Sequence, residues 1–122
     1  MDLVVSRSDH GTVSVFAVEG EFRAFTPSFR ELQAQVLGAL SEGRLDLIVD
    51  CGKLEYADST ALGNLVGIHM DVRRQGGRMA LCNLLPGLAR VIEKANLQRY
   101  FHIQPSVTEG LAMMKAESME AS

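Results

Sequence analysis

Two adjacent hydroxyl side chains, Ser59 and Thr60, follow Asp58 directly before a stretch with helical periodicity. Backbone N–H groups in the first turn of a helix have no intrahelical partner and carry partial positive charge. A phosphate attached to Ser59 would therefore meet ready hydrogen-bond donors, which makes Ser59 a candidate phosphate acceptor. The same pattern also suits a purely structural role, in which Ser59 or Asp58 caps the helix. We expect residues 58–60 to begin a helix and the Ser59 hydroxyl to be accessible to solvent.

The sequence lacks the arrangements that nucleophilic or nucleotide-hydrolysing enzymes use. Ser59 does not lie in a Gly-x-Ser-x-Gly motif, and the chain has no Gly-x-x-x-x-Gly-Lys-Ser/Thr loop. The three histidines, His10, His69 and His102, occur in unrelated sequence contexts. We therefore expect no catalytic residues and no enzymatic activity.

The two cysteines, Cys51 and Cys82, belong to no Cys-x-x-Cys pair and have no adjacent Cys/His cluster. A disulfide framework and a structural zinc site are both disfavoured by this pattern. We expect two buried thiols in a reducing cytosol, and neither a metal nor another cofactor.

The overall charge and hydropathy narrow the class of partner. A net charge of −3 gives no positive field of the kind that nucleic-acid binding needs, so we expect no nucleic-acid partner. No apolar run approaches the roughly 18 residues that a membrane span requires, so direct membrane insertion is not expected either. The N-terminus carries an acidic residue and leads directly into a strand pattern, so it does not resemble a signal peptide. We therefore expect a cytoplasmic protein.

Gly63 and Gly67 lie four residues apart in the stretch that follows Ser59. Small residues at this spacing share one helix face. They suit either close packing within the fold or a docking face for a partner, because a partner helix needs close approach to the backbone. Asn64 would flank that face.

The elements that must position these residues alternate along the chain. Two β-rich stretches, at 4–5 and 13–18, are separated by a turn at 9–11, and the second alternates with period two. They predict an antiparallel hairpin. We expect residues 20–22 to leave the sheet, Thr26-Pro27 to open a helix ending near Gly43, and residues 51–57 to form a loop. Further strands are expected at 45–50, 79–82 and 100–103, and further helices from 58, from 86 and over 107–114. This order predicts an α/β fold with a mixed four- to five-stranded sheet covered mainly by about four helices. One domain spans residues 1–116, and residues 117–122 are expected to be a frayed C-terminal tail.

The segment around Ser59 resembles the signature of STAS domains, the family of anti-sigma factor antagonists and related bacterial regulators. The matching residues of this segment are Asp50, Leu54, Tyr56, Asp58, Ser59, Thr60, Leu62 and Gly63. The resemblance continues upstream through Gly20-Glu21 and downstream from Gly76-Gly77-Arg78 to Phe101, so that it spans nearly the whole chain. It implies a single STAS-like domain.

The resemblance also implies a function. A serine kinase that is itself the anti-sigma factor would phosphorylate Ser59, with Thr60 as the alternative acceptor, and a PP2C-type phosphatase would reverse the modification. Unmodified protein would bind the anti-sigma factor and so release a sigma factor. The partner-binding residues in this hypothesis are Asp58, Ser59, Thr60, Ala61, Gly63, Asn64, Gly67 and Arg23.

Two positions depart from the family pattern. Ala61 replaces the usual glycine and adds a methyl group where a kinase must approach the backbone, and Arg23 reverses the charge of an acidic residue often found near the site. Both favour the alternative hypothesis, a constitutive STAS subunit of a larger assembly, such as a stress-signalling complex or a lipid-transport ATPase, without phosphorylation switching. The intact Asp58-Ser59 pair favours the phosphorylation switch.

Overall fold

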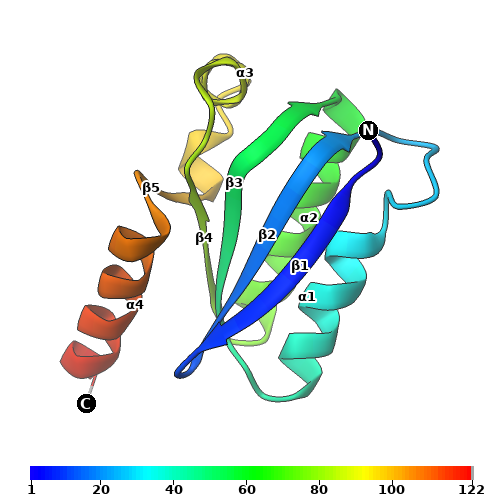
Figure 1. Ribbon diagram of the computed structural model, residues 1–122. Coiled ribbons are helices and arrows are strands. Elements are labelled where there is room, and N and C mark those ends of the chain that lie inside the picture. Colours follow the sequence, from blue (N-terminus) through cyan, green and yellow to red (C-terminus); the bar gives the residue numbers. More distant parts are fainter. Residues whose placement is uncertain (122) are drawn as a thin grey trace.

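A five-stranded mixed sheet forms the centre of the computed structural model, which describes the backbone of residues 1–121 and the side chains of residues 1–116 (Figure 1). Its strands lie in chain order: β1 (Val4–His10), β2 (Val13–Phe22), β3 (Asp46–Ala57), β4 (Arg78–Cys82) and β5 (His102–Gln104). The first two strands form the expected antiparallel hairpin, and every later neighbouring pair is parallel. The predicted α/β fold with a mixed sheet is confirmed.

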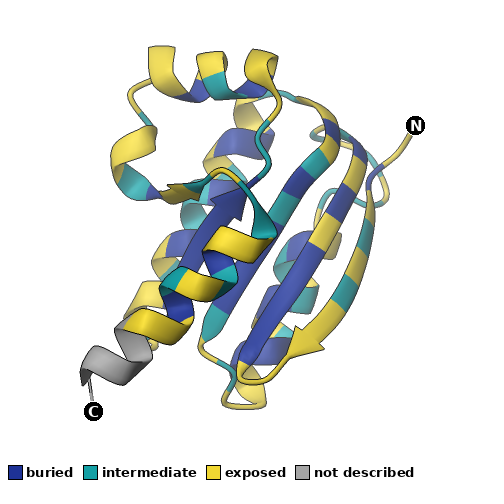
Figure 2. Ribbon diagram, turned by 60° about the vertical axis from the view of Figure 1, so that its left-hand side comes forward, coloured by how far each residue is buried: buried dark blue, intermediate teal, exposed yellow. Residues whose placement is uncertain are grey.

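The described residues form four α-helices: α1 (Glu31–Ser41), α2 (Ser59–Arg74), α3 (Pro86–Lys94) and α4 (Val107–Ala121). A short 3₁₀ turn, Gln98–Tyr100, precedes β5. Each of α1, α2 and α3 connects two parallel neighbouring strands. Because such crossovers are right-handed and all three step across the sheet in the same direction, these helices lie on one face of the sheet. Helix α4 covers part of the opposite face (Figures 1 and 2).

The alternating side chains of β3 supply both cores. Leu47 and Val49 belong to the larger core under α1, α2 and α3, whereas Ile48 points to the smaller core under α4. Cys82 and Met114 belong to that smaller core, and both are fully buried. The centre of the sheet is therefore covered on both faces. This suits the consecutive apolar residues of β3, which need burial on both sides.

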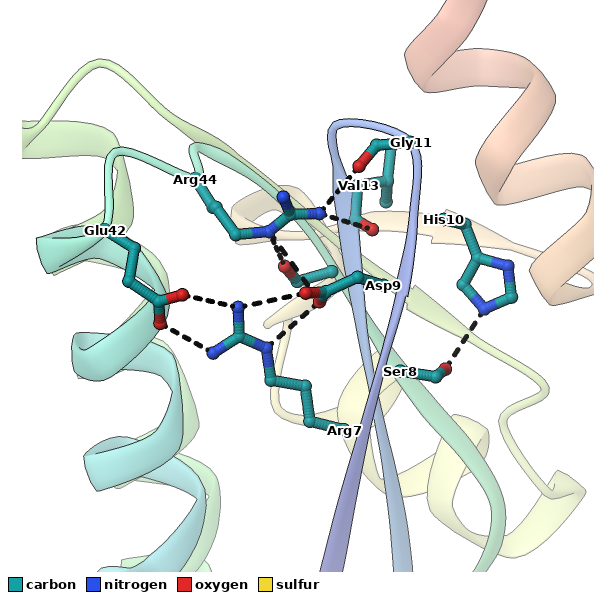
Figure 3. Close-up of polar contacts among 9 residues, drawn as sticks. Arg7, Ser8, Asp9, His10, Gly11, Val13, Glu42 and Arg44 are labelled. Carbon is teal, nitrogen blue, oxygen red and sulfur yellow. Dashed lines mark hydrogen bonds and ion pairs between the residues drawn. The ribbon is translucent and has the colours of Figure 1, made fainter.

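The hairpin is fastened to the end of α1 by two arginines (Figure 3). The Arg7 guanidinium donates hydrogen bonds to Asp9, with Nε 3.0 Å from Oδ1, and to Glu42, with Nη1 2.8 Å from Oε2. Arg44 donates from Nε to the Ser14 hydroxyl at 2.6 Å. The hydrogen bonds with Arg7 hold the pKa values of Asp9 and Glu42 below their usual range. These contacts fix the turn of the hairpin relative to the helix layer.

The prediction of a loop at residues 51–57 is wrong, because these residues continue β3 without interruption. Residues 20–22, expected to leave the sheet, continue β2 as well. The two extensions pair with each other, with Gly20 beside Leu54 and Phe22 beside Ala57. The pairing includes register shifts between Ala17 and Glu19 and between Gly20 and Glu21. Backbone pairing with the neighbouring strand outweighs the local turn preference.

The helix expected to open at Thr26-Pro27 begins instead at Glu31, so that prediction is wrong. The Thr26 hydroxyl donates to the carbonyl of Arg23 at 2.9 Å rather than to a helix terminus. The Ser28 hydroxyl donates to Asp2, which lies 26 residues earlier in the chain. Side-chain contacts outside the segment therefore hold these residues in turns.

The other predicted elements are confirmed to within a few residues, with β5 shorter than expected because residues 98–100 form the 3₁₀ turn. Helix α4 extends to Ala121, into the segment 117–122 that the sequence assigns to a tail. The side chains of that segment and residue 122 lie outside the described residues, so the frayed tail stays a prediction.

Candidate functional site

Asp58 occupies the junction between β3 and α2. It is the N-cap residue of α2, and its Oδ1 accepts a hydrogen bond from the Ala61 N–H at 2.8 Å. Its Oδ2 accepts a second bond from the Ala24 N–H at 2.9 Å, which ties the segment after β2 to the start of α2. These two backbone donors hold the pKa of the Asp58 carboxyl below its usual range. Asp58 is therefore ionised at neutral pH.

Ser59 is the first residue of α2 and is exposed. Because Asp58 provides the cap, the Ser59 hydroxyl makes no hydrogen bond with the described side chains and backbone groups. The expectations that residues 58–60 begin a helix and that Ser59 lies at the surface are both confirmed. Thr60, the alternative acceptor, is also exposed. The capping role considered for the motif therefore belongs to Asp58, and the neighbouring Ser59 is exposed to solvent.

Arg23 lies close to this junction, as the sequence led us to expect. Its guanidinium carbon is 4.1 Å from the centroid of the Tyr56 ring, and its Nε lies 2.6 Å from Glu21 Oε2. The positive charge of Arg23 also contributes to the lowered pKa of Asp58. The charge that Arg23 brings to the site is therefore offset by Glu21 at short range.

Ala61 does not lie on the surface of the site. It is 0% exposed, and its methyl group packs in the larger core. The expectation that this methyl group faces an approaching kinase is therefore wrong, and Ala61 offers no side chain for a partner to contact. Ala61 lies on the face of α2 that packs against the sheet, which the linear motif does not reveal.

Gly63 and Gly67 face open space. A Cβ atom built on either glycine would have no atom outside its own helix turn within 4 Å. Close packing within the fold therefore does not explain them, and the docking interpretation stays open. Together with Ser59, Thr60 and Asn64 they form a band along α2 that we call the α2 stripe. Asn64 binds α1 through a 3.3 Å hydrogen bond from its Nδ2 to Gln33, so α1 flanks the stripe on one side.

The family model for the STAS domain matches residues 5–110. The chain belongs to the STAS domain family. It is 22% identical over 119 residues to the anti-sigma F factor antagonist of Paenibacillus polymyxa, a match that covers 97% of this chain and 100% of that protein.

Solved structures agree on the fold of this STAS domain. An anti-sigma factor antagonist from Mycobacterium paratuberculosis matches with a TM-score of 0.80 and 20% identity, covering 93% of this chain and 95% of that one. The Bacillus cell fate determinant SpoIIAA in its phosphorylated form matches with a TM-score of 0.69 and 18% identity, covering 91% and 99%. At these identities the likeness establishes the fold alone.

Sequence reasoning missed two exposed apolar residues of this STAS domain, one beside the site and one further along α2. Phe25 is 103% exposed and has a φ of 64°, in the left-handed region that bulky residues rarely adopt. Its neighbour Ala24 donates the hydrogen bond to Asp58, so Phe25 sits one residue from the site. Met70 extends the α2 stripe by three residues and is exposed as well. No sequence signal separates Phe25 from Phe22 and Phe29, because only the turn conformation turns it outward.

The described part of this STAS domain holds no group of three or more His, Cys, Asp or Glu side chains that could bind a metal ion. Cys51 and Cys82 are unoxidised and buried, as expected, and they lie in different cores. Burial raises the pKa of Cys82 to about 11 and raises that of Cys51 further, so both thiols stay protonated. Within residues 1–121, no helix is long and apolar enough to cross a membrane.

Proposed function

We propose that this STAS domain is a phospho-regulated, non-enzymatic binding module, an anti-sigma factor antagonist. In its unmodified form it binds an anti-sigma factor that is also a serine kinase, and the bound anti-sigma factor releases its sigma factor. Phosphorylation of Ser59 ends the interaction, and a PP2C-type phosphatase restores it. The names of the relatives support the general role, since the matched protein of Paenibacillus polymyxa is an anti-sigma F factor antagonist.

One observation carries the proposal: the Ser59 hydroxyl is exposed because Asp58 performs the capping role beside it. A kinase must bring the γ-phosphorus of ATP in line with the hydroxyl oxygen that attacks it. A hydroxyl engaged as the helix cap would first have to give up its bond to the backbone. At Ser59 the acceptor requires no such rearrangement.

The α2 stripe supplies the surface for the partner. Its two glycines, about one helical turn apart, leave the backbone of α2 without side chains there, so a partner element can approach closely. Thr60 and Asn64 lie at the stripe beside these glycines, and Arg23 lies at the end that holds Ser59. A partner centred on Ser59 would therefore cover the cap, the hydroxyl and the bare backbone together.

A phosphate on Ser59 would act through charge. It adds about −1.5 to −2 charges at neutral pH, and it would lie next to Asp58, which is already ionised. Inside an interface that excludes water, two neighbouring anions facing the partner repel it strongly, because like charges are poorly screened there. The phosphorylated form is then the free form.

The experiment uses the serine-kinase anti-sigma factors encoded in the same genome, each purified and mixed with this protein, Mg²⁺ and ATP. Mass spectrometry should find one added phosphate, on Ser59. Calorimetric titration should show that phosphorylation weakens binding by roughly ten- to a hundredfold, the equivalent of about 1–3 kcal/mol. Ser59→Ala should stay unmodified and bind normally, and Ser59→Asp should bind more weakly.

Thr60→Ala is the matched control, because it removes the neighbouring hydroxyl and leaves Ser59 in place. Loss of the phosphate in Thr60→Ala alone would move the acceptor to Thr60. Equal affinities of the phosphorylated and unmodified forms would rule out the switch and favour the constitutive subunit. The burial of Ala61 already removes one of the two sequence arguments for that alternative.

A further inference from the structure

A cavity of about 470 Å³ lies at the opposite end of α2 from Ser59. It is lined by the last turns of α2, by Gly76 and Gly77, and by the first residues of β4 and β5. Arg73 lies fourteen residues after Ser59, about 21 Å along the helix, so this cavity is separate from the site described above. It brings together His69 and His102, which lie in unrelated parts of the sequence.

The side chains that line the cavity are cationic or neutral. Arg73, Arg78, His69 and His102 line it, and the lining residues within the described chain include no Asp or Glu. Arg78 Nη2 lies 2.9 Å from Asp46 Oδ1, which fixes the position of its guanidinium. Arg73 forms no ion pair with another described residue, whereas the adjacent Arg74 pairs with Asp71 at 2.6 Å.

His69 is the buried polar group of this cavity. The residue is 3% exposed, and its Nδ1 has no hydrogen-bond partner among the described residues. The ring packs edge-on to Phe101, with centroids 5.5 Å apart. Burial lowers the pKa of His69, and the charges of Arg73 and His102 lower it further, so the ring is neutral and presents one N–H donor. His69 therefore borders the cavity with a neutral, almost fully buried ring whose Nδ1 is unpaired among the described residues.

The cavity lies near the C-terminus of α2, where some of the helix carbonyls are paired within the chain. The Val72 carbonyl accepts hydrogen bonds from the N–H groups of Gln75 and Gly77, and the Arg73 carbonyl accepts one from Gly76. Two of the last four carbonyls of the helix are therefore paired with residues that follow it.

We propose that this cavity binds a small anionic metabolite that carries a phosphate or carboxylate group. Arg73 supplies the fork of N–H donors that matches either oxyanion, and His102 and the buried His69 ring flank it. The cavity volume falls within the range of about 300–1,000 Å³ typical of small-molecule sites.

The test is a titration of the full chain with inorganic phosphate, pyrophosphate and citrate, each at constant ionic strength set with chloride. NMR follows the imidazole signals of His69 and His102. Saturable shifts of both rings are expected with at least one of the three anions and not with chloride. A stronger response to pyrophosphate assigns a phosphorylated ligand, and a stronger response to citrate assigns a carboxylate.

Arg73→Gln should weaken the binding at least tenfold. Arg74→Gln is the matched control, because it removes the same charge from the next residue, outside the cavity, and it should bind as the wild type does. His69→Phe keeps an apolar ring against Phe101 and should also weaken binding. Equal weakening by the two arginine variants, or the absence of a saturable shift with all three anions, would overturn the proposal. Ser59→Ala should bind the anion unchanged, which separates this test from that of the proposed function.

Discussion

Asp58 uses its two carboxylate oxygens for two different tasks, and the tasks can be separated by substitution. In Asp58→Asn the amide oxygen still accepts from Ala61, but the amide nitrogen cannot accept from Ala24. Asp58→Ala removes both bonds. We expect Asp58→Ala to lower the free energy of unfolding by about 1 kcal/mol or more, the usual cost of a lost N-cap, and Asp58→Asn to cost less. Urea unfolding of the wild type and the two variants measures these losses. Equal losses in Asp58→Asn and Asp58→Ala would show that the hydrogen bond from Ala61 makes no separate contribution to stability.

The same carboxylate makes a pH-dependent contribution to stability. The pKa of Asp58 is lower in the folded state than in the unfolded chain, because two backbone N–H groups stabilise the charged form. Its contribution is therefore complete above the unfolded-state pKa and is lost as the pH falls below about 4. Urea unfolding between pH 6 and pH 3 should show a shallower loss in Asp58→Asn than in the wild type. Parallel curves would contradict this assignment.

Helix α2 contains glycines that reduce its own stability. Nothing within the fold requires Gly63 or Gly67, because a Cβ at either position meets open space. Replacement of either by alanine should raise the free energy of unfolding by about 0.5–1 kcal/mol. If the α2 stripe is the docking surface, the added methyl group should also weaken binding to the anti-sigma factor at least tenfold.

Gly38→Ala in α1 is the matched control, since Gly38 is also helical and also faces open space. It should stabilise the fold to a similar extent without changing the affinity for the partner. Chemical unfolding gives the first quantity and calorimetric titration the second. Unchanged affinity in both Gly63→Ala and Gly67→Ala would remove the α2 stripe from the interface.

At the scale of the whole molecule, α4 is held against the sheet by a close contact at Gly110. A Cβ at this position would lie 2.8 Å from Cys82 Sγ and 3.1 Å from Ile48 Cδ1. The cost of overpacking, about 1–3 kcal/mol, exceeds on average the gain of roughly 1 kcal/mol from removing a helical glycine. We therefore expect Gly110→Ala to destabilise the protein in thermal unfolding.

A second substitution tests the cause. Cys82→Ala removes the atom nearest to the new Cβ. Gly110→Ala should therefore lower the stability less in the Cys82→Ala variant than in the wild type. Gly87→Ala in α3 is the control, because its Cβ would meet no atom within 4 Å and should not destabilise. Additive effects of the two substitutions at Gly110 and Cys82 would contradict the proposed contact.

The sequence by itself determined the features that depend on neighbouring residues. The order of strands and helices, the N-terminus of α2 at Ser59 and the exposure of its hydroxyl were all predictable, because capping and periodicity act over a few residues. The motif around Asp58 likewise predicted the STAS fold.

Only the tertiary structure decided which way particular side chains face and how far the strands extend. Residues 51–57 include Gly52 and two charged residues and were expected to form a loop, yet they form a strand because β2 runs beside them and pairs with their backbone. Ala61 is buried because α2 packs on the sheet, and His69 and His102 meet because β5 lies beside β4. These outcomes follow from contacts between residues that are distant in the chain. The energies of these contacts outweigh local preferences, so a local sequence pattern does not predict them.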